Sequence, residues 1–279
     1  MSGKSILITG CSSGIGLTCA LGMRARGWRV FATARQGEDI ERLQDAGLDV
    51  IYMDYDEPES VESCVSEVAR RTHGKLFALF NNGAYGQPGA VEDLSRDVLR
   101  AQFETNVFGW HDLTRRVIPM MRAQGAGRIV QNSSILGLVA MKWRGAYVAS
   151  KFAIEGLSDA LRLELRGSGI HVSLIEPGPI WSKFMDTALK HYDENIDVEH
   201  SPYRAYYLER RKRLAGESRP NRFKLPPEAV LKKLIRAVES PRPKARYYVT
   251  VPTHVMGALR RVLPTRALDA ILDKASDGN

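Results

Sequence analysis

The chain has 279 residues and a net charge of +8, and its 44% hydrophobic and 26% charged residues are typical of a globular protein. Three cysteines (Cys11, Cys19, Cys64) without CxxC or Cys/His spacing exclude a zinc site and a disulfide framework, which favours a reducing, cytoplasmic location. A signal-peptide pattern and a window of about 18 apolar residues are both missing, so we expect neither secretion nor membrane association.

The basic excess lies in residues 181–279, because acidic and basic residues balance over residues 1–180. Such an asymmetry can attract nucleic acid, an anionic membrane surface or an anionic ligand. Acidic residues are interspersed with the basic ones, and no nucleic-acid motif accompanies them. We therefore expect a solvated surface and no nucleic-acid partner.

Short apolar runs alternate with helical patterns along most of the chain. We expect strands over residues 5–9, 28–34, 50–53, 76–80, 128–131, 172–175 and 247–251. Helices are expected after residue 16, near 60–71, across 95–122 and across 147–166. Because continuous apolar runs indicate strands buried on both faces, the pattern predicts a three-layer α/β fold with a doubly wound parallel sheet, the Rossmann fold. No linker interrupts it, so residues 1–279 are expected to form a single domain.

The last hundred residues depart from this alternation. Residues 181–226 are rich in aromatic and charged residues without a clear strand, which predicts an irregular substrate lid. A helix over Glu228–Glu239 follows Pro227. Within the C-terminal extension, residues 252–279, the amphipathic and basic stretch 259–274 predicts one helix. It is expected to pack on the body or on a partner subunit, with a membrane-surface helix as the alternative.

A glycine-rich turn, TGCSSGIG at residues 9–16, joins the first strand to the first helix. Gly10 allows the tight turn, Gly14 lets the backbone approach a pyrophosphate, and Gly16 lets the helix pack on the sheet. The amino terminus of a helix attracts phosphate. The turn therefore predicts a dinucleotide site that also includes Ser12, Ser13 and Ile15.

Arg35 stands at the end of the second strand, where an acidic residue would select NAD. A guanidinium pairs instead with a 2′-phosphate, so Arg35 predicts NADP(H) as the cofactor. Glu38 and Asp39 would oppose this preference if the chain folded them back towards the ribose.

Tyr147 and Lys151 lie four residues apart, on one face of a predicted helix. A nearby ammonium favours the phenolate, which moves the tyrosine towards proton transfer near neutral pH. Ser134, just beyond the fifth strand, is placed to hydrogen-bond a substrate oxygen. Asn106 is placed to hold, through its amide, a water that connects Lys151 to solvent.

In this order the motifs resemble the short-chain dehydrogenase/reductase family, in its single-domain branch. The resemblance implies catalytic roles for Asn106, Ser134, Tyr147 and Lys151. It adds to the cofactor contacts Asp54 at the adenine and a set that lies nearer the nicotinamide: Asn82, Tyr147, Lys151, Pro177, Gly178, Ile180 and Ser182. Two departures, Gly83-Ala84 for the usual Ala-Gly after Asn82 and Ser182 for a threonine, preserve the chemistry.

The turn, the Arg35 region and the C-terminal extension are similar to 17β-hydroxysteroid and retinol dehydrogenase-like members. The residues 173–180 and 246–250 resemble bacterial NADPH-dependent aldehyde reductases. The family's usual contacts, made by helices near 107–122 and 147–166, imply a homodimer or homotetramer.

The substrate site is expected between residues 181–226 and the loop after Ser134. Its apolar candidates favour a lipophilic carbonyl or alcohol substrate: Leu136, Val139, Met141, Trp143, Trp181, Phe184 and Met185. His191 and His200 have no defensible metal-ligand spacing, so no metal is expected.

Three functions remain open at this point. The first is an NADPH-dependent reductase of lipophilic aldehydes or ketones. The second is a steroid or retinol dehydrogenase that works oxidatively. The third, a non-catalytic NADP-sensing protein, is disfavoured because Tyr147 and Lys151 are both present.

Overall fold

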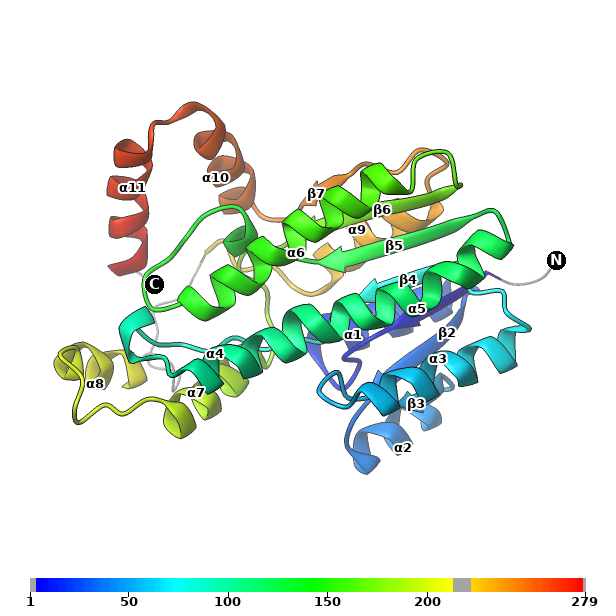
Figure 1. The fold of residues 1–279 in the computed structure, drawn as a ribbon, viewed down its shortest axis with the longest axis horizontal. Coiled ribbons are helices and arrows are strands. Elements are labelled where there is room, and N and C mark those ends of the chain that lie inside the picture. Colours follow the sequence, from blue (N-terminus) through cyan, green and yellow to red (C-terminus); the bar gives the residue numbers. More distant parts are fainter. Residues whose placement is uncertain (1–3, 213–221, 278–279) are drawn as a thin grey trace.

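The sheet is built from the apolar runs that lie between the helices. In this computed structural model, which describes residues 4–212 and 222–277, seven parallel strands form one sheet in the order β3-β2-β1-β4-β5-β6-β7 (Figure 1). The strands are β1 (Ser5–Ile8), β2 (Arg29–Ala34), β3 (Asp49–Tyr52), β4 (Ala78–Asn81), β5 (Gly127–Asn132), β6 (Ile170–Glu176) and β7 (Arg246–Tyr248). The predicted doubly wound α/β fold is confirmed.

Helices cover both faces of the sheet. One layer contains α1 (Gly14–Ala25), α2 (Gly37–Asp45) and α9 (Glu228–Glu239). The other contains α3 (Pro58–Thr72), α5 (Gly109–Ala123) and α6 (Gly145–Glu164). In β1, Ile6 and Ile8 are buried against the first layer and Leu7 against the second. Both faces are apolar, which is why the strands read as continuous apolar runs.

Two further helices occupy the segment that was expected to be irregular. They are α7 (Phe184–Asn195) and α8 (Arg204–Lys212), so the prediction of an irregular lid over residues 181–226 is wrong in this part. Residues 213–221 of that segment lie outside the described residues. Helix α2 was not expected either, because only Ile40 and Leu43 in it are aliphatic.

The C-terminal extension also differs from its prediction. The last strand ends at Tyr248, and Val251 already begins α10 (Val251–Val262). The predicted helix 259–274 is divided at Pro264, because proline disfavours helical backbone in the residue before it. Leu263 is accordingly extended, with φ −92° and ψ 140°, and α11 (Thr265–Asp277) follows. Figure 1 shows α10 and α11 as a hairpin beside the loop that precedes α6.

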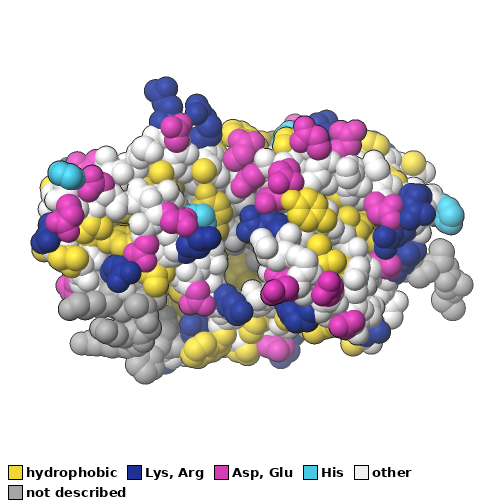
Figure 2. Space-filling view, turned by 90° about the horizontal axis from the view of Figure 1, so that it is seen from below, with side chains coloured by type: hydrophobic (Ala, Val, Ile, Leu, Met, Phe, Trp, Pro, Cys, Tyr) yellow, Lys and Arg dark blue, Asp and Glu magenta, His cyan; other side chains and the backbone are white. Residues whose placement is uncertain are grey.

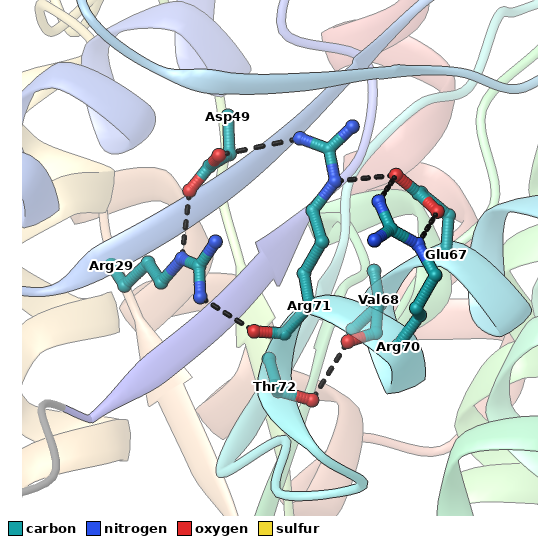
Figure 3. A network of polar contacts seen from close by, with 7 residues as sticks. All are labelled: Arg29, Asp49, Glu67, Val68, Arg70, Arg71 and Thr72. Atoms are coloured by element: carbon teal, nitrogen blue, oxygen red, sulfur yellow. Dashed lines mark hydrogen bonds and ion pairs between the residues drawn. The ribbon is translucent and has the colours of Figure 1, made fainter.

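A surface network fixes the amino-terminal end of β2 to β3 and α3 (Figure 3). Arg29 donates to Asp49 over 2.8 Å and to the Arg71 carbonyl over 2.7 Å. Arg71 in turn pairs with Asp49 and with Glu67, which Arg70 also contacts. Such exposed pairs each contribute little to stability. The network therefore lies at the end of β2 opposite to Arg35.

A further helix, α4 (Arg96–Phe103), runs through a π-helical turn, Glu104–Phe108, into α5. None of the helices in the described part of the chain is long and apolar enough to cross a membrane.

Candidate active site

The carboxyl ends of the central strands open into one large cleft of about 2000 Å³. Figure 2 shows it as a hollow in one face of the molecule, with charged side chains around its rim. The glycine-rich turn, Arg35, Ser134, Tyr147 and Lys151 all line it. Ligands bind at this edge in open parallel sheets. The structure therefore brings the predicted cofactor residues and the predicted catalytic residues to one place.

At two positions of the glycine-rich turn, only glycine fits the local structure. Gly10 has φ +64°, and a Cβ on Gly16 would lie 2.0 Å from the Gly10 carbonyl oxygen. Within the described residues, the Ser13 side chain makes no capping bond at the start of α1. The first N–H groups of α1 are thus left for a ligand, which fits a nucleotide phosphate. Ser182 lies against Gly14, with its Cβ 3.0 Å from the position of an added Gly14 Cβ.

Arg35 and Asp54 are brought together at the far end of the cleft. The Arg35 Nη1 lies 3.1 Å from the Asp54 Oδ2, and the Arg35 side chain is 59% exposed. A second guanidinium reaches the same region, because Arg42 Nη2 donates to the Ser12 carbonyl over 2.6 Å. Sequence reasoning missed Arg42, since it lies in the unexpected helix α2. Asp39, a residue that could oppose NADP, pairs with Arg42.

Tyr147 projects from α6 towards Ser134, near the start of the segment that follows β5. Burial raises the pKa of Tyr147 to about 12, while the hydrogen bond with Ser134 and the charge of Arg144 oppose this rise. The Ser134 hydroxyl also accepts the N–H of Leu136 over 3.0 Å, which fixes its position. The phenol is therefore protonated near neutral pH and is held beside a second hydroxyl.

Lys151 is 1% exposed and lies one helical turn after Tyr147. Its Nζ donates to the Asn132 carbonyl over 2.9 Å and lies 4.2 Å from the centre of the Trp110 ring. Desolvation lowers the pKa of Lys151 to about 7, and the charge of Glu155 opposes this fall. The charge of Lys151 is thus sensitive to pH in the physiological range.

Asn106 lies in the π-helical turn and is fully buried. Its Nδ2 donates to the Tyr85 carbonyl over 2.9 Å and to Ser150 Oγ over 3.1 Å, and its Oδ1 accepts the Tyr85 N–H. Both amide hydrogens are therefore used by protein groups. The side chain therefore holds the segment after β4 against α6.

The remaining predicted cofactor contacts lie around the turn. Asn82 Nδ2 donates to the Thr9 carbonyl over 3.0 Å, and its Oδ1 accepts from Asn132. The Pro177 carbonyl accepts the Ile135 N–H over 2.7 Å, which joins the segment after β6 to the segment after β5. Cleft-lining residues of this group are Ile15, Asn82, Pro177, Gly178, Ile180 and Ser182.

The apolar arm of the cleft includes Leu136, Val139, Met141, Phe184 and Met185, as expected. Trp143 and Trp181 are not among the described residues that line the cleft, so the structure corrects both placements. Trp143 has φ +64° and stacks on Tyr206 at 4.0 Å, inside the aromatic cluster of the lid. Trp181 is 59% exposed beneath Lys224. The hydrophobicity of a tryptophan does not tell which cavity it fills.

Comparison with known proteins agrees with this geometry. The family model described as short chain dehydrogenase matches residues 4–193. The chain belongs to the short-chain dehydrogenase family. It is 44% identical over 269 residues to the uncharacterized oxidoreductase YbbO of Escherichia coli (strain K12), covering 96% of this chain and 94% of YbbO. It is therefore an oxidoreductase of this family.

Two other members extend the comparison. Human 17-beta-hydroxysteroid dehydrogenase type 1 is 32% identical to this short-chain dehydrogenase, over 90% of this chain and 78% of the human one. A short-chain dehydrogenase/reductase from Burkholderia phymatum, solved in complex with NAD, is 26% identical, with a TM-score of 0.77 over 97% of this chain and 95% of the other.

Behind Lys151, this short-chain dehydrogenase holds a partly buried charge cluster that the sequence did not reveal. Arg246 of β7 donates from Nη2 to Glu155 and to Asp159 of α6, each over 2.8 Å, and its Nε lies 3.3 Å from Glu176 of β6. Three carboxyl groups thus share one guanidinium. Burial and the charge of Glu155 raise the pKa of Glu176 to about 9, so Glu176 retains its proton near neutral pH.

Proposed function

We propose that this protein reduces lipophilic aldehydes or ketones to alcohols with NADPH, and that Tyr147 donates the proton. The observation that carries the proposal is the phenol of Tyr147, which is held beside Ser134 in the cleft that also contains the glycine-rich turn. NADPH, when bound, supplies the hydride that the carbonyl carbon receives.

The chain's own residues then act on the substrate oxygen. Ser134 hydrogen-bonds the carbonyl oxygen, and Tyr147 transfers its proton to that oxygen as negative charge develops there. The ammonium of Lys151, fixed by the Asn132 carbonyl, favours the phenolate that remains on Tyr147. Because burial raises the pKa of Tyr147, the free protein has the proton in place for reduction rather than for alcohol oxidation.

The proposed preference for NADPH over NADH is supported by two cations near the turn. Arg35 is exposed at the cleft, and Arg42 contacts the Ser12 carbonyl. A bidentate guanidinium suits a 2′-phosphate, and that group is present only in NADP.

Replacing Arg35 with alanine is expected to lower kcat/KM for NADPH by about 10–100-fold, because one charge-assisted contact contributes about 1.5–3 kcal/mol. The kcat/KM for NADH should stay unchanged. Arg29→Ala, at the opposite end of the same strand, is the matched control and should leave the cofactor ratio as in the wild type. A wild-type protein that prefers NADH would overturn the assignment.

The lipophilic substrate class is supported by the apolar arm of the cleft and by the steroid named in one relative. The test is NADPH oxidation with aldehydes and ketones of graded chain length, together with a steroid ketone and retinal. We expect the highest kcat/KM with apolar aldehydes. Turnover of the matching alcohols with NADP, without measurable reduction of any carbonyl, would support the oxidative dehydrogenase instead.

We also propose a homodimer or homotetramer that uses α5 and α6. Large apolar side chains are exposed at Phe108, directly before α5, and at Leu157 and Leu163 of α6. The three cysteines are free and buried thiols, which supports a cytoplasmic location.

A further inference from the structure

The C-terminal hairpin, α10 and α11, contributes side chains to the cleft that contains Tyr147. Pro252 and Met256 come from α10, and Leu272 and Ala275 come from α11. The sequence pattern indicated only a helix packed on the body or on a partner. The structure packs this hairpin on the body, where it forms a wall of the apolar arm.

Polar contacts hold the hairpin on the loop that follows Ser134. Arg260 of α10 donates to the Leu138 carbonyl, and Lys142 forms an ion pair with Asp273 of α11. The Lys142 N–H also donates to Ser276 Oγ over 3.2 Å. Both helices are thus fixed to residues 138–142, which contribute Val139 and Met141 to the cleft.

The first residues of the hairpin lie against the cofactor side of the site. A Cβ on Gly178 would come within 2.2 Å of Thr250 Oγ1, directly before α10 begins. Thr250 Oγ1 also lies 3.0 Å from Thr253 Oγ1, and both threonines are buried. The start of α10 is therefore fixed relative to the segment 177–180, and the helix leads away from it.

The chemistry of this wall suits a flexible apolar chain. Methionines come from three sides of the cleft: Met141 from the loop, Met185 from α7 and Met256 from α10. Unbranched thioether side chains adapt their shape to different apolar partners. Leu272 and Ala275 add an aliphatic surface from α11.

We propose that the α10–α11 hairpin closes the end of the apolar arm, and that Leu272 sets the length of an unbranched aliphatic aldehyde that the site accepts. This inference rests on the carbonyl reduction proposed above. It assigns the selection of chain length to α11. Proton transfer and cofactor binding are assigned to residues near the carboxyl ends of the strands.

Two neighbouring residues of α11 give the test a matched control. Leu272 lines the cleft, whereas Ile271 does not line it and is 36% exposed. The experiment measures kcat/KM with NADPH for aliphatic aldehydes from about four to about twelve carbons, for Leu272→Phe, Leu272→Ala, Ile271→Phe and Ile271→Ala. Because one methylene changes discrimination by about 10–200-fold in an apolar pocket, small changes of volume should be visible.

In Leu272→Phe, kcat/KM for the longest good substrates should fall by about tenfold or more, with the shortest unchanged. In Leu272→Ala the optimum should move to longer chains, and both Ile271 variants should keep the wild-type profile. An active wild type whose profile is unchanged in both Leu272 variants, or shifts equally in the Ile271 variants, overturns this inference alone. A wild type that reduces no carbonyl overturns the proposed function and this inference with it.

Discussion

Tyr147→Phe is expected to lower kcat/KM for carbonyl reduction by about 10²–10⁴-fold, the range typical of losing a general acid. The substitution removes only the hydroxyl. The ring keeps its edge contact with Phe184, whose centroid lies 5.3 Å away. Cofactor binding, measured by the change in NADPH fluorescence, should therefore stay close to that of the wild type.

Tyr192→Phe provides the matched control for this loss. Tyr192 is buried in the lid cluster, and its hydroxyl has no hydrogen-bond partner among the described residues. Its removal should leave kcat/KM within about twofold of the wild type and should not lower the Tm. Full turnover by Tyr147→Phe would show that another group donates the proton.

Arg246→Met is expected to lower the free energy of unfolding by about 3–5 kcal/mol, because it leaves the buried carboxylate of Glu155 without its cation. The methionine replaces part of the side-chain volume, so the loss reports charge more than packing. The same substitution at Arg204, whose pair with Glu199 is exposed, should change the Tm little. Urea unfolding of the three proteins at neutral pH measures the difference.

The pH dependence identifies the carboxyl that carries the proton. The pKa of Glu176 is raised in the folded state. The stability that its bound proton gives to the fold is therefore complete below the ordinary pKa of a glutamate, and it is lost as the pH rises through about 9. Glu176→Gln should therefore gain stability relative to the wild type as the pH rises from about 5 to about 9. A difference that does not vary over this range would mean that Glu176 is ionised throughout.

The features that local sequence determines were predicted from the residues alone. The turn at residues 9–16 needs glycine at fixed positions, and the phenol and the ammonium share a helix face because they lie four residues apart. The strands were found because both of their faces are apolar. Each of these signals lies within a few consecutive residues.

Features that depend on distant contacts were missed or misplaced. Arg246 meets Glu155 across 91 positions, and nothing near either residue indicates the other. Trp143 was assigned to the substrate site because it is apolar, but three lid tyrosines provide its contacts: Tyr203, Tyr206 and Tyr207. The sequence pattern predicted one helix here because the apolar periodicity continues past Pro264. The helical backbone, however, does not continue through the residue before this proline.

The hairpin also bears on how such a protein can change over evolutionary time. Most side chains of α11 are exposed, so substitutions there remove little buried surface and cost little stability. Proteins tolerate new mutations only while they stay above a stability threshold. Because α11 lines the cleft but contributes little to the buried core, its residues can vary with little loss of stability. New substrate ranges can therefore arise there while the buried charges and the glycine-rich turn stay unchanged.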